Sequence, residues 1–179
     1  MRTITASEFA DILKKDKIDP NELQRLAVEK LLKSGKKVAT AESCTGGLIS
    51  KRITEVSGSS GVFDCGVCSY ANFIKHKLLG VSEDTLATVG AVSPETAEQM
   101  SAGVRALAQA DFGVSTTGIA GPTGGTPEKP VGLVYISVSC ESETAVVRTL
   151  LGDAQPPTRE NIRKIASDIA LWLLIKQIP

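Results

Sequence analysis

The feature that most constrains this chain is an alternation of short apolar segments with longer segments of helical periodicity. Strands are predicted at residues 36–43, 62–71 and 111–118, and at least one predicted helix separates each from the next. Two more strands, at 133–141 and 144–151, follow each other across a short charged turn, as in a β-hairpin. Helices between strands favour parallel pairing, whereas a hairpin adds antiparallel strands. The sequence therefore predicts an α/β protein, a three-layer α/β/α sandwich with a mixed, mostly parallel sheet.

Two of the predicted helices carry clear start signals. Asp19 and Ser93 are N-cap residues, and each is followed by a proline, which is favoured at the first helical position. Residues 1–19 are expected to form an N-terminal helical extension, and residues 20–179 to form one domain. The apolar end of the last helix, IALWLLIKQ, fits the core or a contact between copies, so a homo-oligomer is left open. The helices are predicted at residues 5–15, 19–37, 45–58, 72–80, 93–110 and 156–177.

Composition narrows the class of partner. The chain has 179 residues with 20 basic and 20 acidic side chains, and this balance argues against a broad nucleic-acid surface. Aromatic residues make up only 4%, so a platform for stacking bases is not expected either. The first residues lack the apolar segment of a signal peptide, and no stretch approaches the ~20 apolar residues that cross a bilayer. We expect a cytoplasmic protein without membrane or nucleic-acid partners.

Two glycine-rich turns each follow a predicted strand. They are AESCTGG at 41–47 and TTGIAGPTGG at 116–125. Ligands of open α/β sheets bind beyond the carboxyl ends of parallel strands, so we expect these turns to converge on one site. The backbone amides of the first turn, at the start of a helix, suit a phosphate or an oxyanion. Glu42 in this turn either contacts a ligand or is a buried or capping carboxylate.

Several familiar chemistries lack the residues they need. Cys65 and Cys68 have C-x-x-C spacing, but two residues three apart on a strand point to opposite faces and cannot chelate one metal ion. We expect both to be small core residues. The single histidine, His76, lies between two lysines on a predicted surface helix, so a Ser-His-Asp triad is not expected. Neither glycine-rich turn matches the phosphate-binding loop of ATPases.

A serine can also be activated by a neutral lysine. Tyr70 lies at the end of a predicted strand, and Asn72 and Lys75 follow on the next helix, where residues three apart share a face. A lysine becomes a base when its surroundings disfavour its charge. From the spacing alone, a solvated lysine on an exposed helix is the more frequent outcome.

Four segments together resemble the CinA C-terminal domain family, named for competence- and damage-inducible proteins. They are TAESCTGGLIS, SYANFIKHKLLGV, VGAVSPETAEQM and TTGIAGPTGGTPEKPVG, and the resemblance runs from about Leu23 to the last helix. It implies that residues 20–179 form an amidase domain that hydrolyses the carboxamide of nicotinamide mononucleotide, without a metal or another cofactor. The products would be nicotinate mononucleotide and ammonia, as in the recycling of pyridine nucleotides.

The resemblance also implies roles for individual residues. Ser43 would be the nucleophile, Lys75 its general base, and Tyr70 a group that orients or relays the proton. Cys44 would be a packing residue. The residues expected to bind the substrate, through backbone amides, glycine-rich backbone or side chains, are Thr45, Gly46, Gly47, Asn72, Thr117, Gly118, Gly121 and Arg159.

Two other functions stay open from the sequence. One is a non-catalytic module that binds nucleotides and regulates, linked to competence or to the DNA damage response, since family membership does not guarantee turnover. The other is a direct role in DNA uptake or repair, which the neutral charge and the few aromatic residues disfavour.

Overall fold

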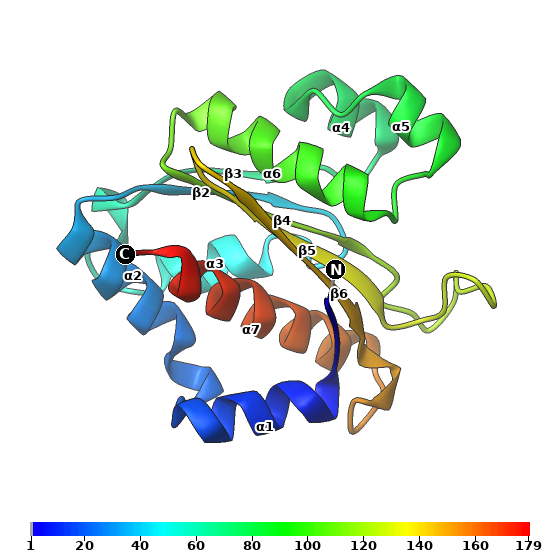
Figure 1. The fold of residues 1–179 in the computed structure, drawn as a ribbon, viewed down its shortest axis with the longest axis horizontal. Coiled ribbons are helices and arrows are strands. Elements are labelled where there is room, and N and C mark those ends of the chain that lie inside the picture. The colour runs from blue at the N-terminus through cyan, green and yellow to red at the C-terminus, as the bar shows by residue number, and fades with distance from the viewer. Residues whose placement is uncertain (1) are drawn as a thin grey trace.

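The computed structural model describes residues 2–179 and contains one six-stranded mixed sheet between two layers of helices (Figure 1). The strand order is β1-β6-β5-β4-β2-β3. The pairs β1/β6, β2/β3 and β2/β4 are parallel, and β4/β5 and β5/β6 are antiparallel. This arrangement confirms the predicted α/β/α sandwich. The strands are β1 (Arg2–Thr5), β2 (Val38–Glu42), β3 (Phe63–Cys68), β4 (Phe112–Gly118), β5 (Leu133–Ser139) and β6 (Thr144–Leu150).

Helices cover both faces of the sheet, and each face has its own apolar core. Helices α1, α2, α3 and α7 cover one face and α4, α5 and α6 the other, as Figure 1 shows. The larger core lies on the α7 side, and a smaller one joins Ala39 and Ala41 of β2 to Leu79, Val81 and Met100. The helices are α1 (Ala6–Asp16), α2 (Leu23–Ser34), α3 (Leu48–Thr54), α4 (Asn72–Leu79), α5 (Glu83–Thr88), α6 (Pro94–Ala108) and α7 (Arg159–Gln177).

The N-terminal segment contains a strand that the sequence did not predict. Residues 2–5 form β1, which pairs with β6 at the edge of the sheet, and Ile4 is fully buried. Four residues are too few to reveal a period of two, so the pattern merged with that of the following helix. Helix α1 forms as predicted and buries Phe9 and Leu13 in the larger core. The division at residues 19 and 20 stays a prediction.

Helix boundaries differ from the predictions where caps and turns decide them. Asp19 caps a short 3-10 turn at Pro20–Glu22, and α2 begins only after it, at Leu23. Ser93 caps α6 with Pro94 at its first position, as predicted. The last helix buries its apolar residues in the core rather than leaving them for a second copy. Among residues 2–179, no helix combines the length and the apolar character that a membrane crossing requires.

The two cysteines of the C-x-x-C spacing lie on opposite faces of the edge strand β3, as predicted. Cys65 packs against the smaller core, but Cys68 is exposed beside Gly47, so the expectation that both are core residues is wrong for Cys68. Alternation along an edge strand turns one of the two outward. Within residues 2–179, no group of three or more His, Cys, Asp or Glu side chains is placed to hold a metal ion.

Candidate active site

Three neighbouring strands bring the predicted site residues to one edge of the sheet. Strands β3, β2 and β4 are adjacent and parallel, so their carboxyl ends meet at that edge. The ladder continues one residue past β2 and β3, because the Ser43 amide donates to the Thr116 carbonyl at 3.0 Å and the Ser69 amide to the Glu42 carbonyl at 2.9 Å. Ser43 and Ser69 therefore stay in sheet register as the chain leaves the sheet.

A pocket of about 180 Å³ lies at this edge and is lined by both glycine-rich turns. The convergence expected from the sequence is therefore present in the fold. Tyr70 is 70% exposed, so the pocket meets solvent at this residue. Five predicted site residues line the pocket, together with Cys44 and neighbours in the second turn: Ser43, Tyr70, Gly118, Gly121 and Arg159.

Arg159 connects two walls of this pocket. It is the first residue of α7, and the hydroxyl of Thr158 caps the helix through the Asn161 amide. One guanidinium nitrogen of Arg159 donates to the Gly121 carbonyl at 2.9 Å, and the other lies 3.4 Å from the Tyr70 hydroxyl. The start of α7 thus fixes the second glycine-rich turn and the end of β3 relative to each other, with a cation at the pocket wall.

Lys75 is buried, in contrast to the exposed lysine that spacing alone favoured. Its side chain is 1% exposed, and its ammonium donates to the carbonyls of Ser69 at 2.7 Å and Tyr70 at 3.3 Å. Desolvation lowers the pKa of Lys75 below its usual 10.5, opposed by the nearby Cys44. Burial raises the pKa of the Cys44 thiol to about 12, so no thiolate forms at neutral pH to hold the proton on Lys75.

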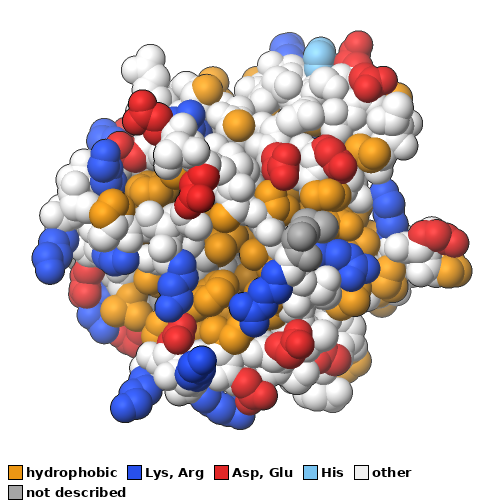
Figure 2. All heavy atoms as spheres, in the orientation of Figure 1, with side chains coloured by type: hydrophobic (Ala, Val, Ile, Leu, Met, Phe, Trp, Pro, Cys, Tyr) orange, Lys and Arg blue, Asp and Glu red, His pale blue; other side chains and the backbone are white. Residues whose placement is uncertain are grey.

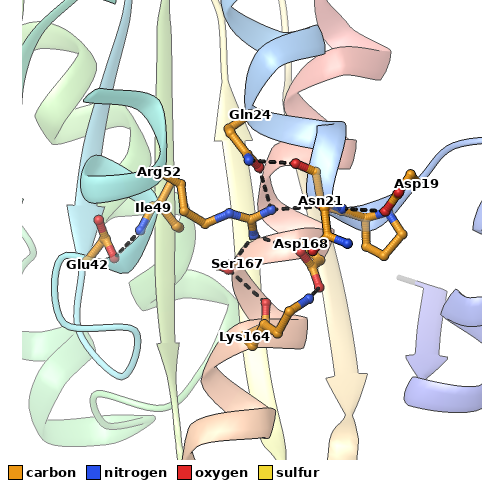
Figure 3. Close-up of polar contacts among 10 residues, drawn as sticks. Asp19, Asn21, Gln24, Glu42, Ile49, Arg52, Lys164, Ser167 and Asp168 are labelled. Carbon is orange, nitrogen blue, oxygen red and sulfur yellow. Dashed lines mark hydrogen bonds and ion pairs between the residues drawn. The ribbon is translucent and has the colours of Figure 1, made fainter. Parts of the chain in front are cut away.

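The first glycine-rich turn, at residues 41–47, is held in place by a buried carboxylate. The buried Glu42 carboxylate accepts hydrogen bonds from the Ile49 and Ser50 amides at 3.0 and 2.8 Å, and Figure 3 shows the bond to Ile49. Of the alternatives for Glu42, capping is the one realised. These amides begin α3, so Glu42 satisfies two of the N–H groups in the first turn of this helix. Within residues 2–179, the amides of Cys44, Thr45 and Gly47 donate to no oxygen.

Two threonines that were expected to bind the substrate have hydroxyls that form hydrogen bonds within the protein. Thr45 is fully buried, and its hydroxyl lies 2.7 Å from that of Thr116 on β4. The Thr117 hydroxyl donates to the Ala91 carbonyl at 2.5 Å and holds the loop before α6. Both hydroxyls thus have partners within the protein, and neither threonine lines the pocket.

The glycines of the site permit tight turns. Gly46 and Gly47 have φ values of +60° and +89°, which side chains with a Cβ rarely adopt. A Cβ on Gly118 would lie 2.5 Å from the Leu133 carbonyl oxygen, so only glycine allows β5 to approach here. Asn72 is exposed on α4 and lines a separate pocket with Phe73 and His76, so the structure does not bring it to the others.

Arg163 was missed by the sequence reasoning. Its Nε and Nη2 atoms donate to the Thr45 carbonyl at 3.2 and 2.6 Å, which ties α7 to the turn that carries Ser43. Residues four apart share a helix face, so the spacing from Arg159 was the available signal.

A buried ionic cluster anchors α3 behind the turn (Figure 3). The Arg52 guanidinium is 2.7 Å from both the Asp168 carboxylate and the Ser167 hydroxyl of α7, and it also donates to Gln24 of α2 at 2.8 Å. Lys164 contacts the second oxygen of Asp168 at 2.9 Å. The cluster fixes α3, whose first turn Glu42 caps, against two other helices.

Comparisons with known proteins place this architecture in a family. The family model of the CinA C-terminal domain matches residues 20–178. The chain belongs to the CinA C-terminal domain family. A CinA-like protein of Desulfovibrio desulfuricans is 49% identical over 152 residues, which are 85% of this chain and 36% of that protein. A competence-damage inducible protein of Thermoanaerobacter sp. is 51% identical over 158 residues, 88% of this chain and 38% of its own. The chain thus spans well under half the length of these relatives.

Solved CinA-family structures share the fold over nearly their whole length. The competence/damage inducible protein CihA of Agrobacterium tumefaciens superimposes with a TM-score of 0.84 at 43% identity, covering 88% of this chain and 94% of that one. The competence damage-inducible protein A of Klebsiella pneumoniae gives a TM-score of 0.83 at 30% identity, covering 89% and 96%. The resemblance noted in the four sequence segments is therefore confirmed at the level of the family.

Proposed function

We propose that this CinA domain is a nicotinamide-nucleotide amidase, converting nicotinamide mononucleotide and water to nicotinate mononucleotide and ammonia. The observation that carries the proposal is the buried Lys75, whose pKa desolvation lowers, next to the strand ends that carry Ser43 and Tyr70. A base that works near neutral pH must be largely unprotonated, and burial of a lysine favours that state.

The hydrogen bonds of Lys75 suit a neutral amine. A neutral amine has two N–H donors and one lone pair, and the carbonyls of Ser69 and Tyr70 accept from this nitrogen. The lone pair is then available to take the proton of Ser43. No hydrogen bond joins Ser43 to Lys75 within residues 2–179, and catalytic contacts often tighten only when substrate is bound.

The proposed reaction has two steps. Lys75 takes the proton of the Ser43 hydroxyl as its oxygen attacks the carboxamide carbon. The amide of Cys44, which lines the pocket and donates to no oxygen within residues 2–179, is suited to the oxyanion that forms, and removing such a donor typically costs about 2.7–4 kcal/mol. Lys75 then gives the proton to the departing ammonia, which leaves an ester on Ser43. Lys75 next takes a proton from water as the water oxygen attacks the ester carbon. It then gives this proton to the Ser43 oxygen as nicotinate mononucleotide is released.

The charge at the pocket wall suits a nucleotide substrate. Arg159 lies beside Gly121 at the second glycine-rich turn, and guanidinium groups bind phosphate oxygens through paired hydrogen bonds. We expect Arg159 to carry the 5′-phosphate and Tyr70, in contact with it, to order the site when substrate binds. The basic and acidic side chains on the face in Figure 2 are interspersed, which fits a small anionic substrate better than a nucleic acid.

A non-catalytic nucleotide-binding module is the second candidate. It is favoured by one observation, that Lys75 donates to backbone carbonyls rather than to Ser43. Ammonia release from nicotinamide mononucleotide separates the two. We expect turnover by the native protein, none by Ser43→Ala, and no loss with EDTA. Binding of the nucleotide without ammonia release would favour the module instead, and a dead Cys44→Ala beside an active Ser43→Ala would move the nucleophile to Cys44.

A further inference from the structure

Ser69 stands out because its buried hydroxyl has no hydrogen-bond partner. The residue is fully buried, and its Oγ is one of two buried side-chain polar atoms without a partner in residues 2–179. A buried hydroxyl in such a state is costly, and native proteins nearly always satisfy it. The unsatisfied hydroxyl of Ser69 therefore needs a physical explanation.

The sheet register places Ser69 beside the proposed nucleophile. Glu42 and Cys68 are partners in the β2/β3 ladder, and the continuing bond from the Ser69 amide makes Ser43 and Ser69 the next pair. Paired residues on neighbouring strands point to the same face and lie about 4.8 Å apart. Ala41 and Val67, two residues earlier, contact the smaller core, so Ser43 and Ser69 share the face covered by α4 and α6.

The proposed base approaches Ser69 from the same side. Lys75 of α4 donates from Nζ to the Ser69 carbonyl at 2.7 Å. The nitrogen thus contacts the backbone of Ser69, whereas the Ser69 hydroxyl has no hydrogen-bond partner within residues 2–179. The Ser69 hydroxyl can offer a water molecule one donor and two lone pairs.

We propose that Ser69 orients the water that hydrolyses the ester on Ser43. The inference rests on the amidase function proposed above. Lys75 returns a proton to the leaving ammonia and later takes one from water, so both molecules occupy the space beside its nitrogen. The Ser69 hydroxyl holds the water there, and Lys75 takes a proton from the water as the water oxygen bonds to the carbonyl carbon. Lys75 then gives this proton to the Ser43 oxygen as the bond to Ser43 breaks.

This role predicts a defect confined to the second step. In Ser69→Ala, attack by Ser43 still releases ammonia, but hydrolysis of the ester slows by about 10-fold or more, as for loss of a positioned general acid–base contact. Rapid mixing with nicotinamide mononucleotide should show a burst of about one ammonia per enzyme followed by a slow phase. Mass spectrometry of the quenched protein should find the nicotinoyl nucleotide ester on the peptide with Ser43. Ser69→Cys, which keeps the size of the side chain, should behave in the same way.

Stability gives a readout that does not need turnover. Ser115 is the matched control, because it is also fully buried on the α6 side of the sheet, yet its hydroxyl donates to the Ala97 carbonyl at 2.6 Å. Ser115→Ala should lower the Tm by roughly 2–4 °C, the shift expected per lost hydrogen bond in a chain of this size. Ser69→Ala should leave the Tm unchanged or raise it.

The outcomes separate the two proposals. No ammonia from the native protein would refute the amidase function itself. If the native protein is active and Ser69→Ala shows full turnover, or an equal slowing of both steps without a burst, the role of Ser69 is refuted while the function stands. A Tm loss in Ser69→Ala as large as that in Ser115→Ala would also overturn it, since the hydroxyl would then have a structural partner.

Discussion

Two buried basic side chains lie on opposite faces of the same sheet and differ in the groups that accept their hydrogen bonds. Arg52 is 8% exposed and meets the Asp168 carboxylate at 2.7 Å, with Ser167 and Gln24 taking further donors. Lys75 is 1% exposed and meets two backbone carbonyls, and no carboxylate pairs with it in residues 2–179.

This difference separates a structural role for Arg52 from a catalytic role for Lys75. A paired guanidinium stays charged, and removing its partner leaves an uncompensated buried charge. A lysine without a carboxylate can lose its proton instead, which is the requirement for a base. Arg52, on the side of the larger core, is therefore structural. Lys75, on the side of the smaller core, is the residue that we propose takes part in catalysis.

The largest expected effect is on turnover at Lys75. Lys75→Met keeps the length of the side chain but removes the base, and we expect ammonia release to fall by about 10²–10⁴-fold. Thermal unfolding at pH 7 should show no loss of stability, since a desolvated amine has been replaced by an apolar group. His76→Ala, one residue away and exposed, should keep most of the activity. Equal losses in both variants would contradict the assignment of the base.

The largest expected effect on stability is at Asp168. Asp168→Ala leaves Arg52 buried without its carboxylate, and we expect a loss of about 3–5 kcal/mol in the free energy of unfolding. Denaturant titration of the native protein and the variant measures this difference in the free energy of unfolding.

The matched control for Asp168 is Glu55→Ala. Glu55 is the exposed partner of Lys51, which lies on α3 next to Arg52. Its removal should lower the free energy of unfolding by only about 0.3–0.5 kcal/mol. If the two variants lose similar stability, the cluster around Arg52 is not the anchor of α3 that its geometry indicates.

The comparison also predicts a pH dependence. The lowered pKa of Lys75 means that the neutral amine, the active form, accumulates as pH rises towards 10.5, so kcat should increase with pH along a limb centred below 10.5. In that window the unfolded chain binds more protons at this site than the folded one, so stability also rises with pH. Both trends should vanish in Lys75→Met. A kcat that falls over the same range would contradict the neutral lysine.

The smallest expected effect is at Cys44. The thiol lines the pocket but stays protonated at neutral pH, because burial raises its pKa to about 12. Cys44→Ala should therefore keep most of the turnover and show only a modest loss of stability. Resistance of the native protein to iodoacetamide at pH 7 tests the same point without a substitution.

The layered α/β fold and the meeting of the two glycine-rich turns could be predicted from the sequence. Both follow from local patterns, namely apolar periodicity, the order of strands and helices, and the turn residues after β2 and β4. Five of the site residues predicted from the sequence line one pocket in the fold. They are Ser43, Tyr70, Gly118, Gly121 and Arg159.

The environment of each side chain could not be predicted, because it depends on segments that are distant in the sequence. Spacing alone favoured an exposed Lys75, because the burial of α4 against α6 depends on contacts between distant segments. Glu42 was undecided until α3 presented its amides, and Thr45 and Thr117 found protein partners that no local pattern reveals. Strand β1 depended on pairing with β6, some 145 residues away. Periodicity records the face a residue occupies, whereas desolvation and hydrogen bonding depend on what the rest of the chain places against it.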